Sequence, residues 1–267
     1  MRRILLLLAV VSLIAAPVAA QGPQPWAKAK LDASPRHQEW VTVKNGARSI
    51  HCFVVYPEVR DKAPAVLLIH EIFGLSDWAR DAADEVAAAG YIAIAPDLIT
   101  GMGPGGGDTE SFTGTSMVTK AVSSLPADQV TGDLDAAANY ITQVPACNGA
   151  LYVAGFCWGG GKSFSYATHR HDLKAAFVFY GSAPEDLASI ACPVYGFYAG
   201  NDARISATVP KTTADMKQAG KTYESVIYDG AGHGFMRAGE DPAGSAANKK
   251  AHDDGWARWL SLMKQAG

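Results

Sequence analysis

The sequence has no cluster of basic residues interleaved with aromatic side chains, which argues against a nucleic-acid-binding protein. Its 23 lysines and arginines are outnumbered by 26 aspartates and glutamates, and this acidic balance gives no attraction to an anionic membrane surface. Neither a Cys-x-x-Cys pair nor a Cys/His spacing typical of a metal site occurs. His169 and His171 have no third ligand near them in the sequence, so no metal is expected. The remaining composition, 48% hydrophobic and 18% charged, is that of a globular protein.

Long apolar stretches are also missing, apart from one near the N-terminus. Two arginines precede an apolar run from Ile4 to Ile14, and Val18-Ala19-Ala20 then supplies small residues. This order predicts a signal peptide over residues 1–20 with cleavage before Gln21, because the run is too short for a transmembrane helix. We therefore expect the mature protein to be periplasmic or secreted, without a membrane anchor.

Cysteine is scarce, with four in the whole chain. Disulfides are common in exported proteins, yet if one cysteine serves chemistry, the other three can form at most one pair. Cys52, Cys147 and Cys192 each lie in or beside an apolar run, which is also typical of buried free thiols. The sequence leaves both arrangements open.

The pattern of apolar residues divides the rest of the chain into an N-terminal arm at 21–38 and one domain at 39–267. The arm is polar, contains three prolines and is expected to be extended. The domain opens with a predicted hairpin in which Asn45-Gly46 forms a type I′ turn. Residues 100–127 are rich in glycine and have no steady period, so we expect a long excursion or a lid there.

Continuous apolar runs alternate with helical patterns after the hairpin, which is typical of parallel strands covered by helices on both faces. The fold class is therefore α/β, with a mostly parallel central sheet and an antiparallel N-terminal hairpin. Strands are expected at 40–44, 49–56, 65–69, 92–95, 151–154, 175–180, 194–199 and 223–228, and helices at 76–89, 128–143, 162–167, 208–219 and 248–265.

The pattern Gly155-x-Cys157-x-Gly159 lies between a predicted strand and a predicted helix. It is the pattern of a nucleophile elbow, with cysteine in place of the usual serine. Glycines two residues before and after the cysteine allow the two backbones to approach around a strained residue. A buried structural cysteine beside a glycine-rich turn would give the same pattern, so the partners of Cys157 have to decide between the two.

A thiol that attacks a carbonyl needs a base, an acid that orients the base, and donors for the oxyanion. In an elbow-bearing sheet the acid and then the histidine follow the nucleophile along the chain. Asp202 comes just after one predicted strand, and His233 lies in the glycine-rich loop after the next. This order predicts a triad of Cys157, Asp202 and His233. His70, which ends another buried strand, is expected to be structural.

Five segments together resemble the dienelactone hydrolase family, and the resemblance extends over about residues 48–262. They are His70-Glu71-Ile72-Phe73-Gly74-Leu75, Ala95-Pro96-Asp97-Leu98, Gly155-Phe156-Cys157-Trp158-Gly159-Gly160, Gly200-Asn201-Asp202 and Gly232-His233-Gly234-Phe235-Met236-Arg237. The resemblance implies an α/β-hydrolase fold with the same triad. It also implies that Glu71 is a carboxylate beside the resting thiol and that Arg237 binds a substrate carboxylate. A second substrate-binding arginine, common in the family, has no counterpart, since no arginine occurs between Arg80 and Arg170.

The resulting hypothesis is a cysteine hydrolase of small esters or lactones that works through a thioester acyl-enzyme. The fold implies that the backbone N–H groups of Ile72 and Trp158 form the oxyanion hole. No metal or organic cofactor is required. We expect a monomer, and its expected partner is a small-molecule ester or lactone. Two alternatives stay open: a broad carboxylesterase for neutral esters, and a noncatalytic thiol protein on the same fold.

Overall fold

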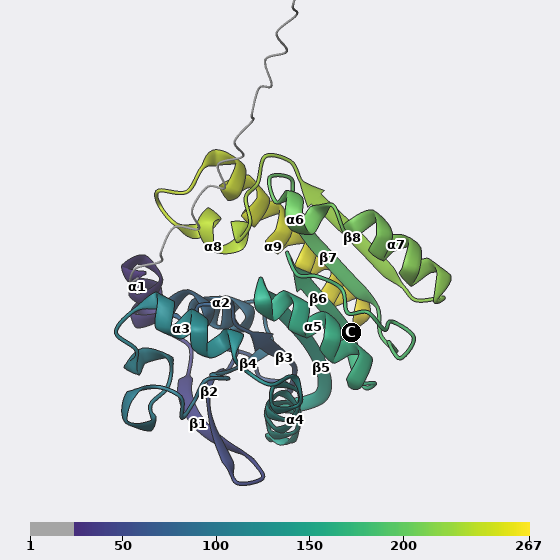
Figure 1. Ribbon diagram of the computed structural model, residues 1–267. Helices are drawn as coiled ribbons and strands as arrows, with labels where there is room; N and C mark the ends of the chain where they lie inside the picture. The colour runs from purple at the N-terminus through teal and green to yellow at the C-terminus, as the bar shows by residue number, and fades with distance from the viewer. Residues whose placement is uncertain (1–23) are drawn as a thin grey trace, which may run out of the picture.

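The computed structural model describes residues 24–267 of the chain (Figure 1). The predicted signal peptide at residues 1–20 lies outside the described residues, so export stays a prediction. Between residues 24 and 267, none of the helices has the length and apolar character that a membrane crossing requires.

An eight-stranded sheet forms the centre of the protein, with the strands in the order β1-β2-β4-β3-β5-β6-β7-β8. β1 and β2 form an antiparallel hairpin, β2 is antiparallel to β4, and the remaining neighbours are parallel, which confirms the predicted sheet. The strands are β1 (Gln38–Asn45), β2 (Arg48–Val55), β3 (Ala63–Ile69), β4 (Ile92–Pro96), β5 (Cys147–Phe156), β6 (Leu173–Phe179), β7 (Val194–Ala199) and β8 (Tyr223–Tyr228).

Helices cover both faces of this sheet, as Figure 1 shows, and bury two separate apolar layers. One layer contains Trp78 and Trp259 from the first group of helices below, and the other contains Phe164 and Met216 from the second. The first group is α1 (Pro25–Ala33), α2 (Asp77–Ala88), α8 (Phe235–Glu240) and α9 (Ala246–Ala266), and the second is α4 (Ala127–Gln143), α5 (Trp158–His169) and α7 (Val209–Gln218). The shorter elements are η1 (Pro104–Gly106), η2 (Thr109–Ser111), α3 (Thr115–Ser123) and α6 (Ala203–Ser206).

The segment predicted as an extended arm contains helix α1, so that prediction was wrong. Pro25 occupies the first turn of the helix, where the missing N–H has no intrahelical partner to lose. Ala27 and Leu31, one helical turn apart, are buried in the same layer as Trp78. Packing of this short apolar stripe therefore stabilises a helix in a segment whose composition indicates an open chain.

The hairpin turn lies one residue later than predicted. Asn45 pairs with Arg48 across the ladder, and Gly46 and Ala47 form the turn, with Gly46 at a φ of 57°. The side chains of Asn45 and Arg48 donate hydrogen bonds of 2.9 and 2.8 Å to the buried carboxylate of Asp133 on α4. These two bonds hold Asn45 within the strand instead of the turn.

The glycine-rich segment 100–127 is not wholly irregular, because it contains α3. Val118 and Val122, four residues apart, are buried on one side of this helix, and Ile99 lies in the same small cluster. The glycines before residue 115 conceal this pattern in the sequence.

Candidate active site

Cys157 lies at the turn between β5 and α5, with a φ of 57° and a ψ of −117°. Such a backbone conformation is strained for a residue with a side chain, and it is held here by the Cys157 N–H, which donates to the Phe179 carbonyl at 3.0 Å. A Cβ on Gly155 would lie 2.0 Å from the Gly159 carbonyl oxygen, and a Cβ on Gly159 would lie 2.3 Å from that of Ile69. Both glycines are therefore required by close backbone contacts, and the predicted elbow geometry is confirmed.

The sulfur of Cys157 lies beside two backbone donors, the N–H groups of Trp158 and Ile72, which favour its charged form. Burial and the negative charge of Glu71 act in the opposite direction and raise the pKa of Cys157 to about 11. The resting side chain is thus a neutral thiol at pH 7. Ile72 and Trp158 are the two residues whose N–H groups the sequence predicts in an oxyanion hole.

Glu71 is buried beside the elbow and is held by two side chains from other elements. Its Oε2 accepts a 2.8 Å hydrogen bond from Arg237 Nε on α8, and its Oε1 accepts one of 3.4 Å from the Tyr180 hydroxyl at the end of β6. Burial lowers the pKa of the Arg237 guanidinium, but the negative charge and the hydrogen bond of Glu71 outweigh burial and raise that pKa above its ordinary value. Arg237 is therefore engaged by a protein carboxylate in this structure, and substrate binding by Arg237 stays a prediction.

His233 and Asp202 meet at the carboxyl edge of the sheet, after β8 and β7 respectively. Nδ1 of His233 donates to Oδ2 of Asp202 at 2.5 Å, which leaves the imidazole Nε2 available. The His233 ring also packs edge-on against Tyr180, with the ring centroids 5.0 Å apart. Among the described residues, no hydrogen bond joins His233 to the Cys157 sulfur. The resting thiol therefore shares a pocket with His233 but is not bound to it.

One pocket of about 480 Å³ brings these groups together, since Cys157, Trp158, Ile72 and His233 all line it. This volume suits a small molecule rather than a folded partner. Sequence reasoning identified these four residues and missed the other residues of the lining, of which Tyr180, Lys162 and Arg204 have the largest polar side chains. Tyr180 follows a strand end, as Asp202 does, so its position carried a signal. For Lys162 and Arg204 the sequence offers no sign that they face the nucleophile.

His70 has the structural role expected from the sequence. Its ring is buried, Nδ1 donates to the Glu71 carbonyl at 2.7 Å, and Nε2 accepts from the Leu98 N–H at 3.4 Å. The ring stacks on Trp158 with centroids 5.6 Å apart. Burial lowers the pKa of His70, so the neutral ring buttresses the strand end that carries Glu71 and Ile72.

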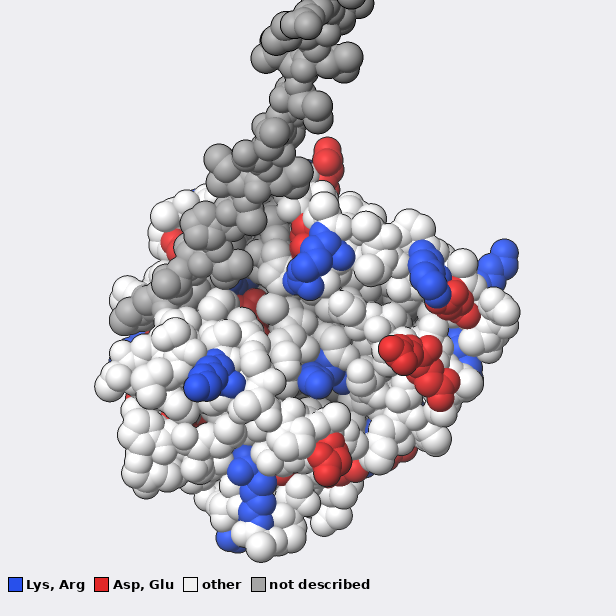
Figure 2. Space-filling model, viewed as in Figure 1, with Lys and Arg blue, Asp and Glu red and all other residues white. Residues whose placement is uncertain are grey.

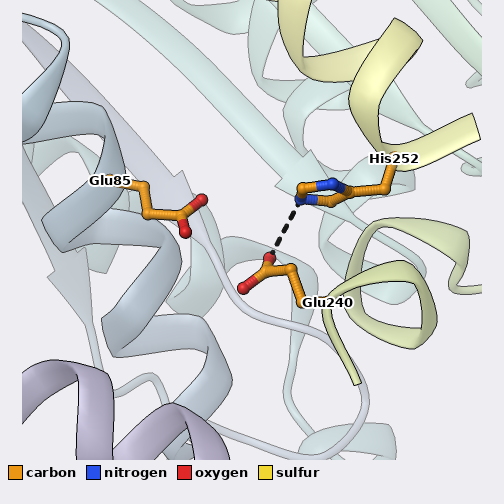
Figure 3. Close-up of side chains that lie close together, drawn as sticks. All are labelled: Glu85, Glu240 and His252. Atoms are coloured by element: carbon orange, nitrogen blue, oxygen red, sulfur yellow. Dashed lines mark ion pairs between the residues drawn. The ribbon is translucent and has the colours of Figure 1, made fainter. Parts of the chain in front are cut away.

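A second cluster of titratable side chains lies between α2, α8 and α9, away from the cysteine pocket. Figure 3 shows Glu85, Glu240 and His252, each with one metal-ligating atom within 4.8 Å of the others. A cation is already present there, because Nζ of Lys30 on α1 lies 2.9 Å from both Glu85 Oε1 and Glu240 Oε2. The same ammonium lies 3.5 Å from Asp81, whose carboxyl pKa is raised to about 8 by burial and by Glu240. We interpret this cluster as an ion-pair network that holds α1 against α2 and α8.

Comparisons with known proteins agree with the motifs and with the fold. A family model described as the dienelactone hydrolase family matches residues 50–267. Two similar proteins, both named putative, are a carboxymethylenebutenolidase from Salmonella typhi and a dienelactone hydrolase from Klebsiella pneumoniae. The first is 34% identical over 226 residues, covering 79% of this chain and 81% of the relative.

The structure of the Klebsiella protein is 29% identical and has a TM-score of 0.74, covering 86% of this chain and 99% of its own. A dienelactone hydrolase from Anabaena variabilis shares the fold with a TM-score of 0.60 at 19% identity, over 81% of this chain and 94% of its own.

Proposed function

The chain belongs to the dienelactone hydrolase family of carboxylic ester hydrolases, and from this premise we propose that it is a cysteine hydrolase of small esters or lactones. The observation that carries the proposal is the common pocket of Cys157, two backbone N–H donors and the His233–Asp202 pair. A nucleophile, a base with its orienting acid, and donors for an oxyanion are the parts that acyl transfer needs.

We propose that Glu71 starts the reaction by accepting the proton of the Cys157 thiol. The thiol is neutral at rest because burial and the Glu71 charge raise its pKa, and this keeps it unreactive without a substrate. Loss of the proton to Glu71 frees the sulfur to turn toward His233. The Glu71 carboxyl then passes this proton through pocket water to the His233 Nε2, so that Glu71 is again a carboxylate and His233 is an imidazolium. Arg237, which binds Glu71, positions that carboxylate, and a substrate carboxylate that reached Arg237 would compete with Glu71 for it.

The thiolate then attacks the ester carbonyl carbon, and the carbonyl oxygen takes up negative charge between the N–H groups of Ile72 and Trp158. The N-terminus of α5 adds partial positive charge at the same point. The His233 imidazolium protonates the departing alcohol or enol oxygen, and a thioester of Cys157 results. Asp202 holds the ring so that Nε2 faces the pocket and stabilises its charge.

Water completes the cycle. Neutral His233 removes a proton from a water molecule, whose oxygen attacks the thioester carbonyl, and the sulfur leaves and takes its proton back. Because a thiolate leaves readily but is a poor base, activated enol or aryl esters and lactones suit this site better than amides. The Salmonella relative is named a putative carboxymethylenebutenolidase, and a butenolide is an unsaturated lactone of this class.

The test measures hydrolysis of p-nitrophenyl acetate and of an enol lactone under reducing conditions. The Cys157→Ala variant should lose activity while its circular dichroism and melting temperature stay close to the wild type. Cys192→Ala removes a thiol that does not line this pocket and serves as the matched control, which should retain activity. Rapid acid quenching followed by intact mass spectrometry should find an acetyl adduct on wild type and none on Cys157→Ala. A Cys157→Ala protein that kept most of its activity would overturn the proposal.

A further inference from the structure

The charged residues that line the cysteine pocket are all basic. Within the described part of the chain, the lining contains Lys162 and Arg204 and no aspartate or glutamate. In Figure 2, which has the same view as Figure 1, one blue patch lies over α5 and another over α6, with a hollowed white surface between them. The pocket therefore presents a positive charge to whatever enters it, although the whole chain is acidic.

Arg204 lines the pocket because it is close in the sequence to Asp202, the proposed catalytic acid. It lies two residues after Asp202, on the short helix α6, and its guanidinium is close enough to favour the charged form of Cys157. Of the ion pairs and side-chain hydrogen bonds formed by residues 24–267, none involves Arg204. An exposed arginine at the mouth of a pocket with no protein carboxylate beside it has its donors free for a ligand.

Lys162 lies on the second turn of α5, the helix that follows the elbow, and lines the same pocket. Its Nζ lies 5.2 Å from the centroid of the Trp158 ring, and the residue is half-buried. Burial lowers the pKa of Lys162, and no carboxylate of the described residues lies within ion-pair distance to offset that cost. A partly desolvated ammonium without a counter-ion is unfavourable in the empty site and is relieved when an anion binds.

Arg237 is less available than Arg204 and Lys162 to bind an anion in the pocket. Only 16% of its side chain is exposed, its Nε is bound to Glu71, and it is absent from the pocket lining. Its guanidinium also lies over the Phe73 ring, 5.6 Å from the centroid. One arginine and one lysine with free donors, Arg204 and Lys162, thus line the pocket of the nucleophile, whereas Arg237 is outside the lining and is engaged by Glu71.

We infer that Arg204 and Lys162 together form an anion subsite that receives a carboxylate of the substrate, separate from Arg237. The inference rests on the proposed ester hydrolysis and specifies its substrate class: esters or lactones that carry a carboxylate near the scissile bond. The carboxylate belongs either to the acyl part or to the leaving group, and both place it between α5 and α6. Binding uses charge-assisted hydrogen bonds from the guanidinium and the ammonium.

The experiment compares two anionic esters with neutral partners. p-Nitrophenyl hemisuccinate carries its carboxylate on the acyl part and is paired with p-nitrophenyl acetate. 4-Acetoxybenzoate carries it on the leaving group and is paired with methyl 4-acetoxybenzoate. The readout is the ratio of kcat/KM for each anionic ester to that of its neutral partner, because a general loss of structure or of thiolate cancels in the ratio.

We expect wild type to favour at least one anionic ester and to lose that preference as sodium chloride is raised to 0.5 M, since salt screens exposed charges. Arg204→Gln and Lys162→Met should each lower the ratio about tenfold. Arg204→Lys should retain an intermediate ratio. Arg60→Gln is the matched control, because Arg60 is exposed in the loop before β3, at the opposite edge of the sheet, and should keep the wild-type ratio.

Three results would overturn the subsite: no anionic preference in wild type, equal losses on both members of each pair in Arg204→Gln and Lys162→Met, or a ratio that changes only in Arg237→Ala. Each of these can occur while Cys157-dependent hydrolysis of p-nitrophenyl acetate persists, in which case the proposed function stands. Hydrolysis that does not depend on Cys157 would instead refute the proposed function, whatever the ratio.

Discussion

Substituting Glu71 by glutamine removes the negative charge beside the Cys157 thiol and keeps the size of the side chain. Burial and then this charge raise the pKa of the thiol from 9.0 to about 11. A difference of two units corresponds to about 2.7 kcal/mol and to a hundredfold smaller fraction of thiolate below pH 9. Glutamine leaves the burial unchanged and also frees Arg237, whose positive charge favours the thiolate. The pKa should therefore fall part of the way back.

The Glu71→Gln substitution should change the rate of thiol alkylation and the rate of ester turnover in opposite directions. Alkylation of Cys157 by iodoacetamide at pH 7.5 should become several-fold faster in Glu71→Gln, with about 100-fold as the upper limit. The advantage should shrink as the pH rises through the variant's pKa and vanish above about pH 11, where both proteins hold a thiolate. Ester turnover should fall, because the amide cannot accept the thiol proton.

Intact mass spectrometry follows the alkylation, with Cys157→Ala to measure labelling of the other thiols. Glu224→Gln is the control, since Glu224 is an exposed carboxylate paired with Arg258 on the surface. Alkylation that is unchanged or slower in Glu71→Gln would refute the electrostatic account of the resting thiol. Faster alkylation together with wild-type acylation in a single turnover would show that Glu71 is not the proton acceptor.

Arg237→Ala should lower kcat for anionic and neutral esters alike, because it leaves the buried Glu71 carboxylate without its cation. Arg237→Lys should lose less activity, since it keeps a cation. A loss confined to the KM of anionic esters would instead show that Arg237 binds the substrate directly. Lys30→Ala should lower the free energy of unfolding by about 1–2 kcal/mol, a figure reduced for the 45% exposure of Lys30. Lys28→Ala, which breaks an exposed pair on the same helix, is the control in urea unfolding; equal effects would contradict the network.

Local patterns in the sequence were sufficient to predict the elements that carry the candidate catalytic residues. The elbow at Cys157 was predictable because Gly155 and Gly159 have no room for a Cβ, a requirement that appears directly as residue type. Asp202 and His233 were predictable as neighbours because parallel strands deliver their carboxyl ends to one edge. The helix that follows each strand was indicated by apolar periodicity in the same way.

Other parts of the structure depend on contacts that no local pattern records. α1 forms because Ala27 and Leu31 pack on distant helices, although Pro25 in the first turn was a usable signal. The pairing of Glu71 with Arg237 joins residues 166 positions apart, so the sequence alone could not show that this arginine is already engaged. For the same reason, neither the direction of Arg204 toward the pocket nor the raised pKa of Cys157 was visible.

The ion pair of Lys30 with Glu240 has a consequence for the order in which the chain folds. The two residues are 210 positions apart, so the first helix of the described chain is synthesised long before its partner on α8 exists. Closing so large a loop is entropically costly until the intervening sheet has brought its ends together. We therefore expect the contact of α1 with α8 to form among the last of the domain, after α1 has packed on α2 through the ion pair of Lys30 with Glu85. A nascent chain that stops before residue 235 would lack the α8 contact and leave α1 more open to proteases, while the strands behind it are already paired.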